Sequence, residues 1–306
     1  MRPFTGIKTA SIRWQVGTRK AAALLTALTV GLGLGWGAWG AESPFTPNDR
    51  ALGKRLEQEA VRLLRGGKVA TNLATQLSKS STLLKLPPPS TRTCPPGELY
   101  PSARRGVVVV GELYLCGKCD QIHVGSASGF ILSESGAMAT CRHVIEHTNT
   151  IGLVAMTGDE RVWPVRGVLA VNRAADVAIV QLEGSGFTPL PITTNAPVGS
   201  PISVLSHPDR HYFMLTTGVI SRYYDLGRRN LRSTWMTVTA PFAKGSSGGP
   251  VLDAAGNVVG LVNNTESIYY DQTARGQRDL QMVMHNCTPA AELMSLIRPP
   301  PAGKAR

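Results

Sequence analysis

The sequence predicts a mainly β protein preceded by an α-helical N-terminal segment. From about residue 105 onward, short runs of Val, Ile and Leu alternate with Gly, Ser, Asn and Asp, which is typical of an all-β sandwich or barrel. Leucines recur at roughly helical spacing in the stretch before residue 87. The hydrophobic fraction of 42% supports a sizeable core and excludes wholesale disorder.

Residues 42–90 are predicted to form a helical segment and a proline-rich linker. Thr46-Pro47 suits a helix start, with Thr as N-cap and Pro at the first helical position. Gly66-Gly67 ends this helix, a weaker helix is expected over 69–78, and Pro87-Pro88-Pro89 marks the linker. We expect the segment to pack on the β region rather than to act as a partner-binding arm. The apolar residues at helical spacing are Leu52, Leu56, Val61, Leu63 and Leu64.

The β region is expected within residues 91–298, followed by a flexible tail over 299–306. A last helix is expected over Pro289–Ile297, with Thr288 as its cap. The expected strands are Gly106–Leu115, Ser128–Ser133, Ala137–Thr140, Val165–Val171, Val177–Leu182, Ser200–Leu205, Thr216–Arg222, Ser233–Thr239, Val251–Leu252 and Val258–Asn263.

Residues 1–41 are predicted to be a signal peptide or a signal anchor. Residues 1–20 carry five basic and no acidic side chains, and residues 21–41 are apolar and uncharged. Small residues near Gly40 favour cleavage after it, although the apolar run is also about long enough for a membrane span, which needs about 20 residues. We therefore expect an exported chain, with membrane attachment only through residues 21–41.

The net charge gives little support to an anionic partner. The formal charge of +12 falls to +7 without residues 1–41, because 27 basic and 20 acidic residues remain. This charge is spread along the chain, so nucleic acid is not an expected partner.

The segment Lys244-Gly245-Ser246-Ser247-Gly248-Gly249-Pro250 is the strongest candidate for a catalytic turn. A nucleophilic serine needs a tight turn that exposes its hydroxyl, and glycines on both sides permit that backbone. The N–H groups of Gly245 and Ser247 then suit an oxyanion hole. By itself, the segment also fits an ordinary Gly-Ser turn between strands.

Two further segments supply the partners that a nucleophilic serine needs. Residues 128–132 and 136–145 indicate a strand hairpin that ends at His143, and Asp176 directly precedes the apolar run Val177–Leu182. A serine hydroxyl needs an imidazole base, and that base needs a carboxylate to orient it. The predicted catalytic residues are therefore His143, Asp176 and Ser247.

In these segments the sequence resembles the trypsin-like, chymotrypsin-fold serine proteases, most closely the bacterial high-temperature-requirement, or Deg, branch. That branch carries the motifs T-x-x-H-V, D-[VL]-A-[IV] and G-[NS]-S-G-G-P in this order, and the resemblance covers about residues 105–298. It implies two six-stranded antiparallel β-barrels with the active site between them. It also implies that His143 is the general base, Asp176 its orienting group and Ser247 the nucleophile, in a bacterial periplasm or cell envelope.

The sequence differs from this family in two respects, and the resemblance also implies a specificity pocket. Eight residues follow Arg298, so no PDZ-like domain is expected, and no trypsin-type zymogen activation sequence is present. An apolar, shallow pocket that accepts small or medium aliphatic residues is expected from Phe242 and from a strand that carries Met282 and Met284. The residues that resemble walls of the primary specificity pocket are Phe242, Lys244, Asn263 and Asn264.

The five cysteines leave several arrangements open. If the first three strands form a meander, Cys116, Cys119, His123 and Cys141 converge beside His143. Export favours a disulfide from Cys141 to Cys116 or Cys119; a strained Cys116–Cys119 disulfide and a Cys₃His zinc site are the alternatives. Cys94 and Cys287 form a further candidate pair.

The leading functional prediction is a serine endopeptidase that acts on exported or envelope polypeptides, in protein quality control, without a cofactor. A protease-like chaperone or scaffold and an esterase with the same triad remain alternatives. The intact triad argues against the scaffold, and the G-S-S-G-G-P context differs from the G-x-S-x-G elbow of many esterases. The remaining histidines, expected to have surface or ordinary hydrogen-bonding roles, are His147, His207, His211 and His285.

Overall fold

The structure is a computed structural model that describes residues 45–95, 97–146, 149–225, 233–273 and 276–300. The predicted signal segment, residues 1–41, lies outside these residues, as do His147 and most of the expected tail. No helix within the described residues is long and apolar enough to cross a membrane.

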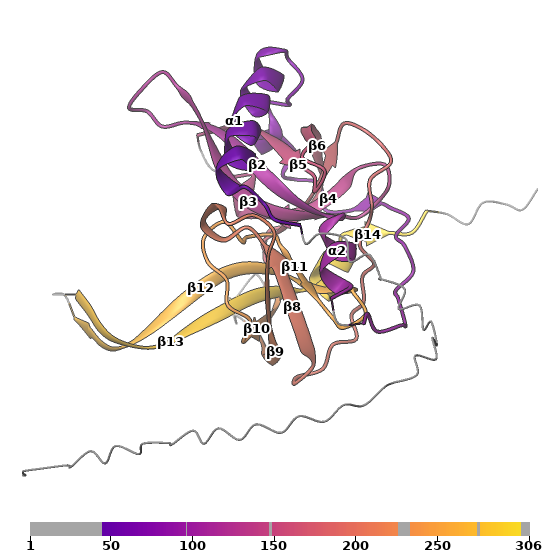
Figure 1. Cartoon of the computed structure of the whole chain (residues 1–306), viewed down its shortest axis with the longest axis vertical. Helices are drawn as coiled ribbons and strands as arrows, with labels where there is room; N and C mark the ends of the chain where they lie inside the picture. The colour runs from indigo at the N-terminus through magenta and orange to yellow at the C-terminus, as the bar shows by residue number, and fades with distance from the viewer. Residues whose placement is uncertain (1–44, 96, 147–148, 226–232, 274–275, 301–306) are drawn as a thin grey trace, which may run out of the picture. The chain divides into compact units, whose positions relative to one another are not determined.

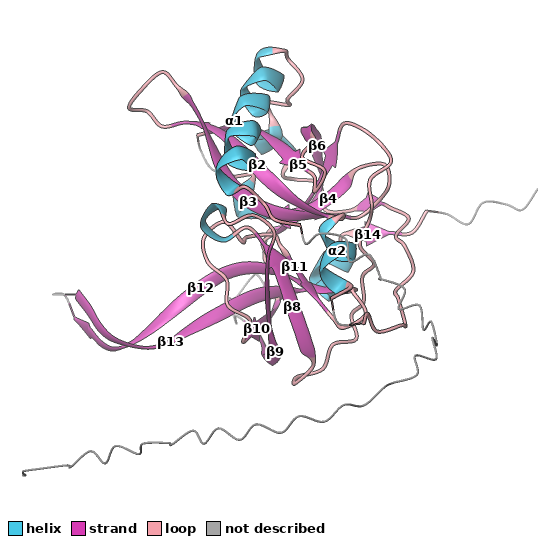
Figure 2. Ribbon diagram, viewed as in Figure 1, coloured by secondary structure: helices cyan, strands magenta, loops and turns pink. Residues whose placement is uncertain are grey.

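Two closed six-stranded barrels make up the β region of the described chain, as the sequence predicts (Figures 1 and 2). The first barrel has the strand order β2-β3-β4-β7-β6-β5, and all its pairs are antiparallel. Its core is built from Val, Ile, Leu and Ala side chains that are fully buried. Its strands are β2 (Val107–Leu115), β3 (Ile122–Ile131), β4 (Ala137–Cys141), β5 (Thr150–Met156), β6 (Val162–Asn172) and β7 (Val177–Leu182).

The second barrel has the strand order β10-β13-β12-β11-β8-β9, again with antiparallel pairs. Its core cluster includes Val204, Ile220, Met236, Val251 and Val262. Its strands are β8 (Pro201–Ser206), β9 (Met214–Asp225), β10 (Thr234–Val238), β11 (Pro250–Leu252), β12 (Val258–Thr273) and β13 (Gly276–Pro289).

Several strand predictions were incomplete, and two of the differences are large. β5 was not predicted, and β12 continues to Thr273 instead of ending near Asn263, where it pairs with β13 as a long hairpin. Most side chains beyond Asn263 on β12 are exposed, so this part lacks the alternating apolar pattern that marks a half-buried strand. Figure 1 shows the outer part of this hairpin extending away from the second barrel.

Helix α1 (Asp49–Arg65) begins slightly later than predicted. Asn48 is its N-cap, since Oδ1 of Asn48 accepts a hydrogen bond from the N–H of Ala51 at 3.0 Å, and the predicted Thr46-Pro47 start is wrong. The helix ends at Gly66, as predicted. The weaker helix expected over 69–78 is a single 3₁₀ turn, Leu73–Gln76.

The apolar face of α1 packs on the first barrel, against β2, β3, β5 and β6. Leu56 sits over Gly111 of β2, where an added Cβ would lie 3.1 Å from Cδ1 of Leu56. The start of the helix also reaches the second barrel, because Oδ1 of Asp49 accepts the N–H of Tyr212 at 3.0 Å. The helix therefore braces the loop before β9. The buried residues of its apolar face are Leu52, Gly53, Leu56, Ala60 and Leu63.

Four short elements complete the fold. Helix α3 starts after Pro289, and the expected cap is wrong, because Oγ1 of Thr288 donates to the carbonyl of Ala175 at 2.8 Å. β1 and β14 form a parallel pair that ties the linker to the end of the chain. The bounds are α2 (Leu99–Arg104), α3 (Ala290–Met294), β1 (Thr82–Leu83) and β14 (Ile297–Arg298).

Candidate active site

His143 and Asp176 are brought together by two neighbouring strands of the first barrel. β4 and β7 pair antiparallel, with Cys141 opposite Val177. His143 follows β4 in the 3₁₀ turn Arg142–Val144, and Asp176 immediately precedes β7. In an antiparallel pair the end of one strand lies beside the start of the other, so both residues lie at the same edge of the barrel.

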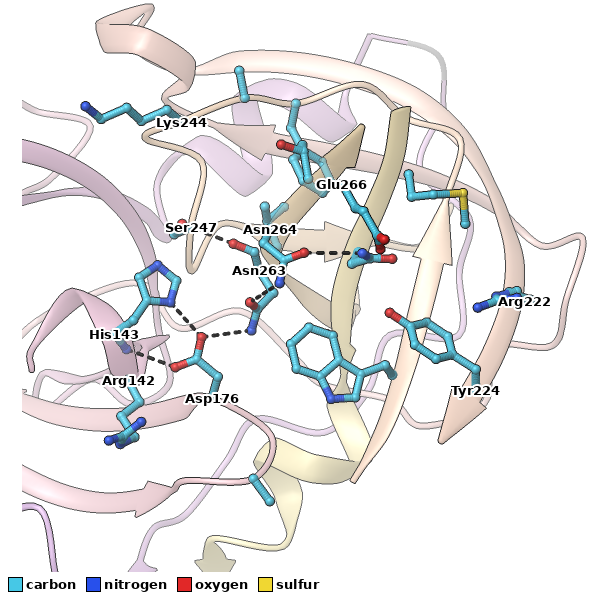
Figure 3. Close-up of a pocket in the computed structure, with 18 of the residues that line it drawn as sticks. Arg142, His143, Asp176, Arg222, Tyr224, Lys244, Ser247, Asn263, Asn264 and Glu266 are labelled. Carbon is cyan, nitrogen blue, oxygen red and sulfur yellow. Dashed lines mark hydrogen bonds and ion pairs between the residues drawn. The ribbon is translucent and has the colours of Figure 1, made fainter. Parts of the chain in front are cut away.

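The carboxylate of Asp176 holds His143 through two contacts, one to the ring and one to the backbone (Figure 3). Nδ1 of His143 lies 2.6 Å from Oδ2, and the backbone N–H of His143 donates to Oδ1 at 2.9 Å. Nδ2 of Asn263 donates to Oδ2 of Asp176 at 3.1 Å. A carboxylate against Nδ1 favours the tautomer with its proton on Nδ1, which leaves Nε2 as the basic nitrogen.

Ser247 lies in a tight turn, Lys244–Gly249, which we call the serine turn. Gly245 and Gly248 have φ values of +94° and +86°, in the left-handed region. A Cβ on Gly245 would lie 2.5 Å from the carbonyl oxygen of His207, and a Cβ on Gly248 would lie 2.3 Å from that of Ser128. Both contacts are too short for any other residue, so the two glycines are required by space as well as by backbone conformation.

The first barrel fixes the position of the serine turn. The N–H of Ser128 on β3 donates to the carbonyl of Ser247, and Oγ of Ser128 donates to the carbonyl of Gly245, both at 2.9 Å. β3 neighbours β4 in the barrel, so these bonds hold the serine turn against the strand pair that carries His143.

Two N–H groups of the serine turn, one on either side of Ser246, are left for an outside acceptor. Those of Ser246, Gly248 and Gly249 donate to backbone carbonyls at 2.8–3.0 Å. The N–H groups of Gly245 and Ser247 donate to no acceptor within the described part of the chain. This pair is the one that the sequence assigns to an oxyanion hole.

The hydroxyl of Ser247 makes a local hydrogen bond. Oγ of Ser247 donates to the carbonyl oxygen of Asn263 at 3.2 Å. In Figure 3 the His143 ring lies between the labelled side chains of Asp176 and Ser247. A rotation about one side-chain bond of Ser247 is enough to turn its proton away from Asn263.

A cleft of about 770 Å³, here called the main cleft, opens beside these residues (Figure 3). The four predicted pocket residues all line it, together with His143, Asp176 and Ser247. Met284 also lines it, whereas Met282 is 57% exposed on the outer hairpin and does not. The predicted pocket residues are Phe242, Lys244, Asn263 and Asn264.

The main cleft is more polar than the sequence predicts. Arg142, Arg173, Arg222 and Glu266 line it, so the expected apolar wall is only one part of its surface. Sequence reasoning missed these residues because they carry no motif. The aromatic residues that it also missed are Tyr224 and Trp235.

A second hollow of about 590 Å³ lies on another side of the same residues. Glu112, Tyr114 and Asn149 line it, and it shares His143 and Ser247 with the main cleft. Concave surface therefore approaches Ser247 from two sides, as an extended chain lying across the serine would require.

The predicted convergence of four cysteine and histidine ligands is wrong. Cys141 is buried beside His143 and Asp176, and its Sγ donates to the carbonyl of Val262 at 3.1 Å. Burial, and next the charge of Asp176, raise the pKa of this thiol. On β3, only Phe130 and Ile131 pair with β4. Cys116, Cys119 and His123 lie at the opposite end of β3.

No disulfide joins any of the five cysteines, so the predicted bonds are absent. The backbone N–H of Cys94 donates to the carbonyl of Ala254, in the turn after β11, at 2.8 Å. Cys287 is buried in the core of the second barrel. Cys116, Cys119 and His123 remain together at the tip of the β2–β3 hairpin.

Two of the remaining histidines have defined surroundings. His207 is completely buried, and its Nδ1 accepts the N–H of Phe213 at 2.9 Å. Burial lowers the pKa of His207 to about 3. His285 packs edge-on against Phe242, and burial also lowers its pKa.

Comparisons with known proteins agree with this geometry. Residues 127–261 match the family model of the trypsin-like peptidase domain. Serine protease HTRA1 of Xenopus laevis is 28% identical over 155 residues, which are 46% of this chain and 32% of that protein. The putative serine protease HhoA of Synechocystis sp. is 30% identical over 148 residues, which are 45% of this chain and 36% of that protein. The chain thus matches about a third of the length of these curated relatives.

The fold is also found in a solved protease. The crystal structure of the Rv3671c protease from M. tuberculosis, in its active form, superposes with a TM-score of 0.52 and 21% sequence identity, covering 72% of this chain and 92% of that chain. That likeness concerns the fold. By the sequence matches, residues 127–261 correspond to a trypsin-like peptidase domain, and this part of the chain is similar to the HtrA serine proteases.

Proposed function

We propose that the chain is a serine endopeptidase in which Ser247 is the nucleophile, His143 the general base and Asp176 the group that orients it. The observation that carries the proposal is the 2.6 Å contact between His143 Nδ1 and Asp176 Oδ2, at the cleft that Ser247 also lines. Three chain segments from two barrels supply these groups. Such an arrangement is what an acyl-transfer site needs.

The geometry supports a two-step hydrolysis. Nε2 of His143 takes the proton of Ser247 as Oγ attacks the substrate carbonyl carbon, and the resulting oxyanion accepts hydrogen bonds from the N–H groups of Gly245 and Ser247. His143 then gives its proton to the leaving amine as the peptide bond breaks. Water, deprotonated by His143, attacks the acyl-enzyme and releases the carboxylic acid and free Ser247.

Polypeptides are the proposed substrates, because concave surface approaches Ser247 from two sides. Phe242, Lys244, Asn263 and Asn264 are proposed to wall the pocket for the residue before the scissile bond, with a preference for small or medium aliphatic side chains. The wall formed by Phe242 supports that preference, whereas the arginines of the main cleft favour polar or acidic groups elsewhere in the substrate.

The chain organisation and location are also proposals. Residues 1–41 would export the chain or anchor it, residues 42–90 brace the barrels, residues 91–298 carry the chemistry, and residues 299–306 form the tail. The basic stretch followed by an uncharged apolar run supports export to a bacterial periplasm or envelope. A role in protein quality control there is part of this proposal.

Serine-directed labelling separates catalysis from a scaffold role. A fluorophosphonate is expected to label the parent chain and not Ser247→Ala, and that variant is expected to lose about 10⁶ in kcat. Ser267→Ala, which removes an exposed hydroxyl on the outer β12–β13 hairpin, is the control and should keep parental labelling. Absence of labelling in the folded parent would favour the scaffold.

Substrate choice then separates a peptidase from an esterase. The parent chain is expected to cleave unfolded casein and to release amines from peptide amides. Turnover of simple esters without any cleavage of casein or amides would contradict the endopeptidase proposal and favour the esterase.

A further inference from the structure

The tip of the β2–β3 hairpin carries a compact set of sulfur and nitrogen donors that the proposed catalysis does not use. The two strands pair up to Leu115 opposite Ile122, and a short loop joins them. Cys116 and Cys119 lie in this loop, and His123 is the second residue of β3. Their donor atoms all lie within 4.8 Å of one another.

The distances fit a shared metal ion better than a disulfide. The Sγ atoms of Cys116 and Cys119 are 3.4 Å apart, far beyond the S–S bond of about 2.05 Å. Sγ of Cys119 lies 3.2 Å from Nε2 of His123. Around a tetrahedral Zn²⁺, bond lengths of about 2.3 Å to sulfur and about 2.0 Å to nitrogen place ligand atoms about 3.5–3.8 Å apart. The observed spacings are within a few tenths of an ångström of those edges.

The loop backbone already has the shape that brings the two thiols together. Gly117 has a φ of +70°, and the N–H of Lys118 donates to Sγ of Cys116 at 3.4 Å. An N–H directed at the sulfur supports the negative charge that a thiolate ligand carries. The loop is accessible to solvent, so an ion can enter without unfolding of the hairpin.

We propose that Cys116, Cys119 and His123 bind one Zn²⁺ ion at the tip of the β2–β3 hairpin. Two thiolates and an imidazole are ligands that zinc prefers, and each thiol releases its proton to solvent as it binds. A closed structural zinc site has four ligands, so the fourth position is taken by water or by a donor from outside this set. Cys141 is not a ligand, because it lies in a separate group with His143 and Asp176.

The zinc site has a route to the proposed active site. The ring of His123 stacks on Tyr114, with ring centroids 5.5 Å apart and an interplanar angle of 28°. Tyr114 lines the second hollow, together with His143 and Ser247. Coordination through Nε2 fixes the plane of His123, and it therefore fixes one face of Tyr114. This consequence rests on the proposed function, whereas zinc binding itself does not.

Binding is tested on the full reduced chain that carries Ser247→Ala, with Co²⁺ as a spectroscopic probe and Zn²⁺ as competitor. We expect one Co²⁺ per chain, a thiolate-to-cobalt charge-transfer band, and displacement of Co²⁺ by Zn²⁺. Cys119→Ser and His123→Gln should each weaken binding at least about tenfold. Cys94→Ser removes a cysteine that lies beside the turn after β11, outside this donor set, and should leave the band and the affinity unchanged.

Three results would overturn the site. They are no metal uptake by the reduced folded chain, uptake that Cys119→Ser does not weaken, and a Cys116–Cys119 disulfide, found by peptide mapping, that forms even when Zn²⁺ is supplied before oxidation. Cys119→Ser changes an exposed loop position and His123→Gln a half-buried position at the start of β3, and circular dichroism shows whether each variant has folded. None of these readouts needs peptidase activity, so a failure of the proposed function leaves the binding test intact.

The effect on the second hollow is measured in the active chain. Removal of Zn²⁺ by a chelator is expected to raise KM about threefold or more for peptides that extend beyond the scissile bond on the Tyr114 side, with little change in kcat. Peptides that end at the scissile bond should show no change. Equal effects on both peptide classes would contradict the route through Tyr114. The KM of His123→Gln is expected to match that of the metal-free parent and to change little when chelator is added.

Discussion

Asn263 donates its side-chain N–H to Oδ2 of Asp176 at 3.1 Å, and the same oxygen lies 2.6 Å from Nδ1 of His143. The backbone carbonyl of Asn263 accepts the hydroxyl of Ser247 at 3.2 Å. One residue of the second barrel therefore contacts two of the three proposed catalytic residues, one through its side chain and the other through its backbone. Asn263 thus couples the serine turn to the His143–Asp176 pair.

Asn263→Ala is expected to lower kcat about tenfold and to change KM little. A hydrogen bond to a charged group is worth about 1.5–3 kcal/mol, and two N–H donors of His143 still hold the carboxylate after the substitution. The backbone contact to Ser247 is retained. Asn195→Ala, at an exposed loop position, is the control for the loss of an asparagine amide. Steady-state kinetics with a peptide amide measure the effect, and a parental kcat would contradict the role of Asn263.

Asp176→Asn is expected to lower kcat about 10⁴-fold while the fold is retained. Asp176 has a φ of +56°, and asparagine tolerates this left-handed backbone as well as aspartate does. Asparagine has one side-chain oxygen, so its NH₂ group must face either the backbone N–H or Nδ1 of His143. When it faces Nδ1, that nitrogen accepts the hydrogen bond and carries no proton, which is the wrong tautomer of the ring.

Asp279→Asn is the matched control for that substitution, because Asp279 is exposed and has a φ of +55°. It should leave kcat unchanged. Both variants are compared by thermal unfolding, so that a loss of activity can be separated from a loss of fold. Full activity of folded Asp176→Asn would mean that another group orients His143.

The sequence predicts the site well where local strand order determines it. His143 directly follows one strand and Asp176 directly precedes its partner, so their motifs are sufficient to place them together. The glycines of the serine motif likewise predict a tight turn, and Gly245 and Gly248 both have a positive φ there. The contact between Asn263 and Asp176 could not be predicted from such local rules, because it joins the two barrels.

The cysteine prediction failed because it placed the start of the second strand at Ser128, whereas β3 begins at Ile122. β3 has ten residues and β4 has five, and only two residues of each are paired. The β2–β3 tip therefore extends beyond the edge at which Cys141 ends β4. Strand length and register, rather than strand order, decide which of these side chains meet. The apolar pattern of the sequence gives neither the length nor the register of a strand.

Gly245→Ala is expected to lower kcat about 10²–10³-fold, as loss of an oxyanion donor does. The new Cβ would lie 2.5 Å from the carbonyl of His207, and the φ of +94° is strained for alanine, so the N–H must move. Gly186→Ala is the control, since Gly186 has a φ of +78° and open space around it. The control carries the strain alone and should lose about 1 kcal/mol of stability with normal kcat. Gly245→Ala variants with kcat within about twofold of the parent would remove Gly245 from the oxyanion hole.

The buried His207 is expected to make the folded chain less stable in mild acid. Burial lowers its pKa from 6.5 to about 3, so between these values the unfolded chain binds a proton that the folded chain does not. The free energy of unfolding therefore falls as pH falls through this range, by up to about 1.4 kcal/mol per pH unit. Well above pH 6.5 neither state binds the proton, and this contribution to the pH dependence disappears.

His207→Gln tests this assignment in the Ser247→Ala background, which prevents self-cleavage. Glutamine keeps an acceptor for the N–H of Phe213 and does not titrate. Between about pH 7.5 and about pH 5, the parent should lose about 2 kcal/mol more stability than His207→Gln, measured by urea unfolding at each pH. His211→Gln, at an exposed histidine, should retain the parental loss. Since glutamine also changes packing, the comparison uses the slope with pH and not the absolute stability, and equal slopes in parent and His207→Gln would show that another buried group causes the acid sensitivity.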